Sequence, residues 1–496
     1  MARRLSLILA MLLVLNLCGC SDLPQSVTHP AEDTTTPQEE NASAPLQMAL
    51  AYSHDDTLNP FAATTEVNSQ LTGLLYESLM VLDENFIPQL GLAASVEQPD
   101  ATHLTVTLRK GAVFSDGSKV TPEDVVTSFQ EAKKTDRYRA LLSNVTTAKK
   151  EGSRVQFALV SADPNARACL TFPVVKGSTL TDKPAKAPLG SGVYKLKTTD
   201  SGLALVQNKR HPESPAFQEI TLCHLPTNTA RQHALASGEI TYYYDDLSEG
   251  DTPRITGASR KVDTTTLVFV GLNGNRGKLK TAVVRRALSL MLDRTALTQA
   301  AYGEWAMASA APVHPRWDWM SQVDTTADRD LDGATTLLEQ AGCPSKEGKR
   351  LTLELIYVVT RSDRTRMAEQ LRTQAKKAGV ILTLVPLSEK EYRSRLKSGK
   401  YDLYLGESRL TADMSLRPWL AGGSTSYGVS RSGPAAKAYA RYLKEELSLE
   451  KLMTVFAEET PYIPLCWRYG VAGFTRRLTV VTPTGQDPYA GVAQWQ

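Results

Sequence analysis

The sequence LRKGAVFSDGSKVTPEDVVTSF occupies residues 108–129 and predicts three elements in quick succession. Leu104–Arg109, which overlaps its start, alternates apolar and polar residues with the period of two of a half-buried strand. Asp116-Gly117 indicates a tight turn, because glycine accepts the positive φ that such a reversal requires. Thr121-Pro122-Glu123-Asp124 predicts a helix start, with Thr121 as N-cap, proline at the first helical position and Asp124 in a capping box. This order of elements indicates an α/β chain.

A second α/β unit is predicted in the C-terminal half of the chain. Leu351–Val358 and Val380–Val385 have the composition of strands, and Arg364–Gly379 between them has helical periodicity with a glycine terminator. Strand, helix and strand in this order favour a mixed or parallel sheet. Further upstream, Asp293 is expected to cap a helix over Thr295–Tyr302.

Length and composition limit the class of protein. A chain of 496 residues is too long for one ordinary core, so two or three domains are expected. The apolar fraction of 42% and the charged fraction of 22% are those of a soluble globular protein. The formal charge of +3 falls to +1 without Arg3 and Arg4, which gives no electrostatic case for nucleic acid or an anionic membrane surface as partner.

The N-terminus predicts export and lipid anchoring. Arg3 and Arg4 precede an apolar run, Leu5–Leu17, that is shorter than the roughly 20 residues of a membrane-spanning helix, as in a secretory signal. Leu17-Cys18-Gly19-Cys20 resembles the bacterial lipobox, so residues 1–19 are predicted to be a lipoprotein signal peptide and Cys20 the lipidated residue. Residues 20–45 are rich in Thr, Pro, Ser and Glu and are expected to form a flexible tether with a reach of roughly 25–30 Å.

Motifs of catalysis and metal binding are missing from the sequence. No GxSxG, HExxH or Cys/His nucleophile arrangement occurs, so we expect no enzyme and no cofactor. The seven histidines are scattered, without an HxH or HxxxH pair, and a dedicated metal site is therefore not predicted. Export permits disulfides, but no pairing is assigned to the four cysteines beyond the signal, which are Cys169, Cys223, Cys343 and Cys466.

Several stretches together resemble one protein family. Residues 108–129 closely resemble the corresponding stretch of the extracytoplasmic solute-binding proteins of ABC importers, family 5, which includes peptide- and nickel-binding members. Asp56–Leu79 (DTLNPFAATTEVNSQLTGLLYESL), Phe269–Gly303 and Glu459–Leu465 (ETPYIPL) are similar to further stretches of the same family. The resemblance extends over essentially all of the chain from Pro45 to Gln496.

The resemblance implies a fold and a division of the chain. The expected fold is α/β, a two-lobed clam shell like the periplasmic binding proteins (type II, cluster C) with an extra accessory domain. Lobe I is expected to comprise 46–75, 189–265 and 471–496, the accessory domain 76–188, and lobe II 266–470.

The resemblance also implies where a ligand binds. Asp413 matches the aspartate that, in peptide-binding members, pairs with the α-ammonium group of the ligand by a charge-assisted hydrogen bond. The family's Asp-Pro just downstream is replaced by Ser415-Leu416, and this departure puts the peptide preference in doubt more than the fold. The other candidate ligand-binding residues are the aromatic Trp419, Tyr427 and Trp467, the cationic Arg409, and Thr64, Thr65 and Glu66, which fall where relatives offer backbone groups to a peptide.

The implied function is that of a monomeric lipid-anchored receptor on the extracytoplasmic face of the cell membrane. It would capture peptides between its lobes and present them to the permease subunits of an ABC importer. Alternatives are a nickel chelate or another small solute as cargo, or a peptide-sensing receptor without transport.

Overall fold

The computed structural model describes residues 45–180, 187–200, 202–250, 255–323, 325, 328–423 and 425–496. Leu46–Gln496 forms one compact unit. The predicted signal peptide, Cys20 and the tether up to residue 44 lie outside the described residues. Within the described ranges, no helix is both long and apolar enough to cross a membrane.

A four-stranded sheet, which we call the first sheet, contains the N-terminal strand. Its order is β1-β10-β9-β8, with β1 parallel to β10 and the other pairs antiparallel. Leu50, Leu74 and Leu205 lie in the core beneath it, together with the C-terminal Trp495. Its elements are β1 (Met48–Tyr52), β8 (Tyr194–Thr199), β9 (Gly202–Gln207) and β10 (Glu219–His224), with α1 (Glu66–Gln70), α2 (Thr72–Leu75) and α5 (Asn228–Ser237).

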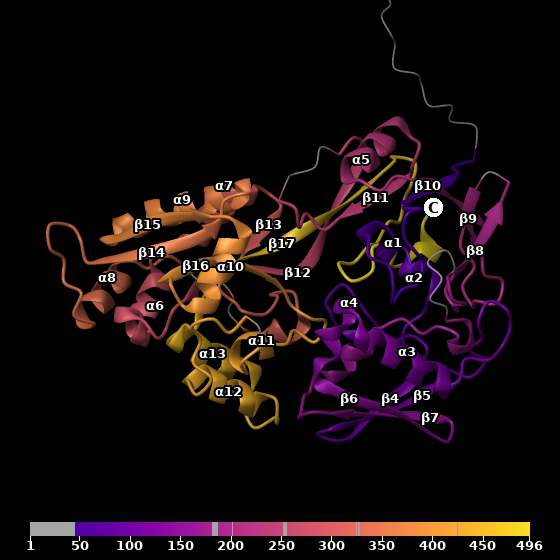
Figure 1. Ribbon diagram of the computed structural model, residues 1–496, viewed down its shortest axis with the longest axis horizontal. Coiled ribbons are helices and arrows are strands. Elements are labelled where there is room, and N and C mark those ends of the chain that lie inside the picture. The colour runs from indigo at the N-terminus through magenta and orange to yellow at the C-terminus, as the bar shows by residue number, and fades with distance from the viewer. Residues whose placement is uncertain are drawn as a thin grey trace, which may run out of the picture. The chain divides into compact units, whose positions relative to one another are not determined.

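A second four-stranded sheet, antiparallel throughout, has the order β4-β5-β7-β6. The predicted capped helix packs on it (Figure 1), and the ring centroids of Phe129 and Phe157 lie 5.8 Å apart. The capping box of Thr121 and Asp124 and the positive φ of Gly117 are both confirmed. The elements are β4 (Ala93–Asp100), β5 (His103–Leu108), α3 (Pro122–Lys134), α4 (Asp136–Arg139), β6 (Val145–Glu151) and β7 (Arg154–Leu159), preceded by the hairpin β2 (Met80–Leu82) and β3 (Pro88–Leu90).

The largest sheet has seven strands, and we call it the long sheet. Its order is β11-β17-β12-β16-β14-β15, with β13 paired to β17. The predicted mixed sheet is confirmed, because β14 is parallel to β15 and β16 while β12 is antiparallel to its neighbours β16 and β17. The strands are β11 (Tyr242–Asp245), β12 (Ala258–Leu272), β13 (Ala306–Ala308), β14 (Leu351–Val358), β15 (Val380–Leu387), β16 (Leu403–Arg409) and β17 (Tyr462–Phe474).

Two cores flank the long sheet, and helices cover them. Asp293 caps α7 as predicted, accepting a hydrogen bond from the backbone N–H of Ala296. The α-helices are α6 (Ala282–Leu290), α7 (Arg294–Tyr302), α8 (Leu331–Gln340), α9 (Ser362–Lys377), α10 (Glu389–Ser398), α11 (Arg417–Leu420), α12 (Pro434–Tyr442) and α13 (Leu449–Glu459). Short 3₁₀ turns occupy Leu141–Asn144, Ala166–Leu170, Gly177–Thr179, Gly277–Lys280, Asp318–Met320 and Val492–Gln494.

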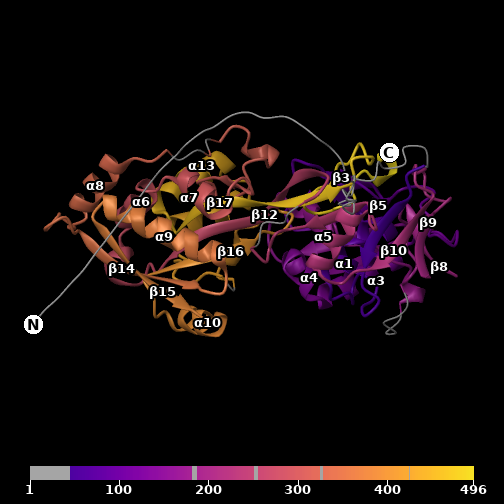
Figure 2. The ribbon, with the colours of Figure 1, turned by 90° about the horizontal axis from the view of Figure 1, so that it is seen from above.

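Strands β12 and β17 belong to more than one core. Val262 and Ala472 lie in the core of the first sheet, whereas Val268 and Ile463, on the same two strands, lie in a core of the long sheet. The two strands run side by side in both views of the ribbon (Figures 1 and 2). Their register shifts between Asp263 and Leu267.

A buried charge network joins α9, β16 and β17 to the loop after β11. Asp363 has no exposed surface, and its carboxylate lies 2.7 Å from Arg361 and 3.6 Å from Arg468. Arg364 and Arg468 also bind Glu407, at 2.7 and 3.4 Å. Burial raises the pKa of Asp363, but the hydrogen bonds of Arg361 and the charges of the other guanidiniums outweigh it and hold the pKa below its ordinary value.

The same guanidiniums fix the loop that follows β11. Arg468 donates to the carbonyl oxygen of Leu247, and Arg361 donates to that of Ser248. Since three guanidiniums face two carboxylates, these backbone carbonyls supply acceptors that the carboxylates do not. The network therefore connects the loop after β11 to β16, β17 and the start of α9.

Replacing Arg468 by Ala should destabilise the fold by about 3–5 kcal/mol, because two carboxylates would lose a buried partner. Equilibrium urea unfolding, followed by tryptophan fluorescence, measures the change. The matched control is Arg441→Ala, which removes an exposed pair with Glu446 and should change the unfolding free energy by less than about 1 kcal/mol. Equal effects of the two substitutions would show that the buried network does not stabilise the fold.

Candidate ligand-binding site

Asp413 lies in the loop between β16 and α11. Only 5% of the residue is exposed, and Met414 beside it has a positive φ of 50°. The Thr411 hydroxyl donates to Asp413 Oδ1, and the Cys169 thiol lies 4.0 Å from Oδ2. The carboxylate is therefore buried against a segment that precedes it by more than two hundred residues in the sequence.

Residues 161–169 contact the same region through a second carboxylate. Arg417, the first residue of α11, donates to Asp163 Oδ2 at 3.2 Å and to the Ser161 hydroxyl at 2.8 Å. Asn165 donates to the Tyr442 hydroxyl of α12 at 3.0 Å. These contacts hold the segment over the loop that carries Asp413.

The charges around Asp413 are unbalanced. Burial raises the pKa of Asp413 to about 7, and the Asp163 carboxylate adds to the rise, while the Thr411 hydroxyl and Arg417 oppose it. Arg417 forms its ion pair with Asp163 instead, and within the described ranges Asp413 forms no ion pair of its own. A cation that reached the ionised Asp413 carboxylate would therefore find a desolvated acceptor that no ion pair among the described residues neutralises.

The two candidate tryptophans are interior residues. Trp419 and Trp467 are both 0% exposed. Trp419 stacks on Tyr462, with ring centroids 5.4 Å apart, and Trp467 lies 5.0 Å from the ring of His314. In this structure both side chains serve the packing of the core and neither forms part of an open aromatic surface.

The contacts of Tyr427 and Arg409 are with residues other than Asp413. Tyr427 is half-buried and stands edge-on to Tyr404 at 6.3 Å. Arg409 is exposed, but its guanidinium contacts Asp246 Oδ2 at 3.3 Å and the Gly485 carbonyl oxygen at 3.1 Å. Arg409 therefore already has acceptors in the protein.

The Thr64–Glu66 segment is engaged by Asp56. The backbone N–H groups of Thr64 and Thr65 donate to Asp56 Oδ2 at 2.9 and 2.7 Å, and the Thr65 hydroxyl donates to the same oxygen at 2.6 Å. Glu66 begins α1, is half exposed, and lies 3.8 Å from Arg137. The N–H groups expected to meet a peptide thus have a partner within their own loop.

The sequence alone does not indicate Asp163 or Arg417 as residues of the site. The two residues are 254 positions apart, and neither lies in a motif with a chemical signature. Only the folded chain brings them together.

A separate polar cavity of about 300 Å³ lies between the β2–β3 turn, β12 and the C-terminal segment. Three carboxylates and three cationic side chains line it, and Asp263 pairs with Arg316 at 3.2 Å. Its lining consists of Asp83, Glu84, Phe86, Arg260, Lys261, Val262, Asp263, Arg316, Thr482, Pro483, Thr484, Gly485 and Gln486.

The four cysteines of the described chain carry free thiols. Burial, together with the Asp413 and Asp163 carboxylates, raises the pKa of the Cys169 thiol well above its ordinary value, so this sulfur stays protonated. In this structure Cys169 is a neutral contact of Asp413.

A comparison with protein families identifies the chain. The model of the bacterial extracellular solute-binding proteins, family 5 (middle), matches residues 87–426. The chain belongs to this family. The family predicted from the sequence is confirmed.

Similar proteins differ in what their names say they bind. The oligopeptide-binding protein AppA of Bacillus subtilis is 24% identical over 408 residues, covering 75% of this chain and 73% of the relative. The nickel-binding protein NikA of Staphylococcus aureus is 23% identical over 333 residues, covering 64% of this chain and 65% of the relative. The solved structure of a nickel ABC transporter protein from Bacillus halodurans has a TM-score of 0.74 at 17% identity, covering 90% of this chain and 99% of that one.

These similarities confirm the predicted fold class, a mixed α/β, two-lobed periplasmic-binding fold. Solute-binding proteins of this family are extracytoplasmic, bind peptides or small solutes without converting them, and work with ABC permeases.

The raised pKa of Asp413 predicts a pH-dependent stability. Because the folded state holds this proton more tightly than the unfolded state, the contribution of the neutral carboxyl is fully present below about pH 4 and is lost as the pH rises through about 7. Asp413→Asn should therefore raise the melting temperature at pH 8 relative to the unmodified chain and raise it less at pH 5. The control is Asp328→Asn, at an exposed aspartate, which should leave both melting temperatures unchanged. A lower melting temperature for Asp413→Asn at pH 8 would contradict the assignment.

Proposed function

We propose that this protein is the ligand-capturing receptor of an ABC importer and that it binds peptides through their free α-ammonium group at Asp413. The observation that carries the proposal is the state of this carboxylate, which is buried, raised in pKa and without an ion pair in the described chain. An ammonium group that donates to it would supply the missing charge.

The burial of the Asp413 carboxylate strengthens its interaction with a cation. A carboxylate already removed from water has little hydration left to lose, so a charge-assisted hydrogen bond to it is stronger than one at the surface. The Thr411 hydroxyl donates to one carboxylate oxygen, Oδ1, and the hydrogen-bond contact of Oδ2 among the described residues is the neutral Cys169 thiol at 4.0 Å. We assign the ammonium to the Oδ2 side.

Ligand entry requires the contacts over the loop to separate. The Arg417–Asp163 pair and the Asn165–Tyr442 hydrogen bond join the loop region to residues 161–169. In our proposal these contacts form on closure, and the ligand favours the closed form by adding interactions that the open form lacks.

The proposed receptor has two lobes, an accessory domain and a lipid anchor. Lobe I would comprise 46–75, 189–265 and 471–496, the accessory domain 76–188, and lobe II 266–470. Lipidation at Cys20 after removal of residues 1–19, with 20–45 as tether, would hold the monomeric receptor at the extracytoplasmic face of the membrane. Asp413 remains our leading candidate for ligand contact, ahead of Arg409, Tyr427 and the Thr64–Glu66 segment.

A nickel chelate or another small solute is the second candidate cargo, and the nickel-binding names among the relatives favour it. A peptide-sensing receptor without transport would use the same site. Native mass spectrometry of protein purified from its own host separates the two cargoes. A ladder of peptide masses supports the proposal, and a single metal complex overturns it.

Asp413→Asn should weaken the binding of a free tripeptide at least tenfold, about 1.5–3 kcal/mol, because a hydrogen bond between charged groups is lost. Isothermal titration calorimetry at pH 8 with free and N-acetylated tripeptides measures the effect in both proteins. N-acetylation should weaken binding to the unmodified chain but scarcely affect Asp413→Asn, since the two changes remove the same interaction. Asp328→Asn serves as the control. If N-acetylation weakened tripeptide binding equally in both proteins, the ammonium group would bind at a residue other than Asp413.

A further inference from the structure

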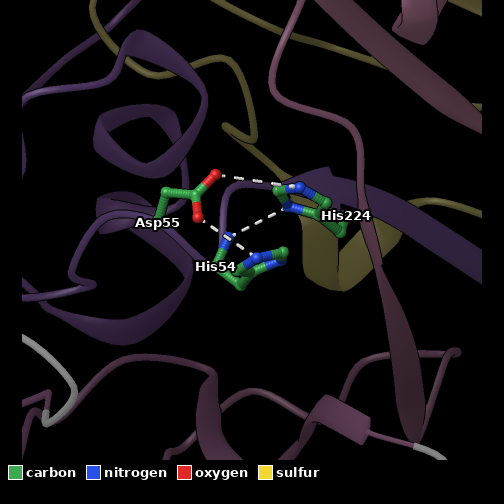
Figure 3. Close-up of side chains that lie close together, drawn as sticks. All are labelled: His54, Asp55 and His224. Atoms are coloured by element: carbon green, nitrogen blue, oxygen red, sulfur yellow. Dashed lines mark hydrogen bonds and ion pairs between the residues drawn. The ribbon is translucent and has the colours of Figure 1, made fainter.

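Two histidines that are 170 positions apart meet at the edge of the first sheet. β1 and β10 are parallel neighbours, and Tyr52 is the register partner of His224, so both strands end at the same edge. His54 and Asp55 follow β1 directly. Figure 3 shows the three side chains of His54, Asp55 and His224 turned toward one another.

The distances within this cluster suit a metal ion. Asp55 Oδ1 lies 3.1 Å from His54 Nε2, and Asp55 Oδ2 lies 3.9 Å from His224 Nε2. One ligand atom from each residue can be chosen so that all three lie within 4.8 Å of one another. Ligands at about 2.0–2.1 Å from a tetrahedral ion stand roughly 3.4 Å apart, so small side-chain rotations suffice.

The backbone on both sides of the cluster is fixed. The Asn68 side chain accepts from the Ser53 N–H at 2.7 Å and donates to the Ser53 carbonyl oxygen at 2.8 Å. On the other side, Asp56 is held by the donors of Thr64 and Thr65. His54 and Asp55 therefore extend from a loop that is anchored at each end.

We propose that His54, Asp55 and His224 form a binding site for a divalent transition-metal ion of the zinc, nickel or copper class. Two imidazoles and one carboxylate suit these ions, whereas magnesium and calcium prefer oxygen ligands throughout. The side chains of His54 and Asp55 are 58% and 70% exposed, so the ion enters directly from solvent and retains coordination positions for water. The site lies apart from Asp413 and goes beyond the proposed peptide function.

Metal binding would remove one hydrogen bond of His224. In the metal-free chain, His224 Nδ1 accepts a hydrogen bond from the His54 backbone N–H at 3.1 Å, which places the ring proton of a neutral imidazole on Nε2. A metal at Nε2 moves that proton to Nδ1, and a metal at Nδ1 displaces the donor, so this hydrogen bond is lost in either case.

Zinc titration of the untagged, chelator-treated full chain tests the site. Isothermal titration calorimetry at pH 7.5 should give one high-affinity ion per chain. His54→Ala and His224→Ala should each weaken the affinity at least tenfold, since even the loss of a residue that only supports a ligand commonly costs this much. His233→Ala, at an exposed histidine of α5, is the matched control and should bind as the unmodified chain does.

Two further readouts keep the test decisive. Unchanged melting temperatures of the metal-free variants show that they fold, and cobalt substitution should give visible d–d absorption that His224→Ala weakens. His224→Ala should leave peptide binding intact and Asp413→Asn should leave zinc binding intact, so failure of either proposal is seen separately. Undetectable zinc binding by the unmodified chain, or equal affinity in His54→Ala, His224→Ala and His233→Ala, would overturn the proposed site.

Discussion

The antiparallel pairing of β12 with β17 is the constraint on which the rest of the structure depends. These two strands contribute to the core under the first sheet at one end and to a core of the long sheet at the other. A strand shared by two cores cannot shift its register without moving apolar side chains out of both. The ion pairs of Asp363, Glu407 and Arg468 lie beside this pairing. Carbonyl oxygens of the loop after β11 accept further hydrogen bonds from the network.

The candidate site shows the opposite electrostatic arrangement. In the network, guanidiniums outnumber carboxylates, and backbone carbonyl oxygens accept hydrogen bonds from the guanidiniums as well. Around Asp413, two carboxylates share the influence of one guanidinium, and Arg417 is committed to Asp163. The first arrangement is complete within the protein and stabilises it. The second lacks a positive charge, and in the proposed function the α-ammonium group of the peptide supplies it.

Local chemistry accounts for what could be predicted from sequence. The capping box at Thr121, the cap at Asp293 and the turn at Gly117 depend on residues within a few positions, so the sequence pattern was sufficient. The site could be predicted only in part. Trp419 and Trp467 are of a residue type that is common in binding surfaces. In the folded chain, however, both side chains lie in the core. The Asp163–Arg417 pair and the approach of His54 to His224 depend on tertiary contacts that no spacing in the sequence reveals.

The register shift in β12 has a mechanical consequence. At the shift, where regular ladder bonds between β12 and β17 are interrupted, the Thr264 hydroxyl donates to the Arg468 carbonyl oxygen at 2.6 Å. The Thr265 hydroxyl donates to the carbonyl oxygen of Leu410 at 2.7 Å. A hydroxyl can rotate about its C–O bond, so such bonds survive a small change of angle that would break a rigid ladder. We expect the chain to pivot at this point with little resistance. In the proposed function, the contacts of Arg417 and Tyr442 then decide between the open and closed forms, and a bound ligand adds to these contacts in favouring the closed form.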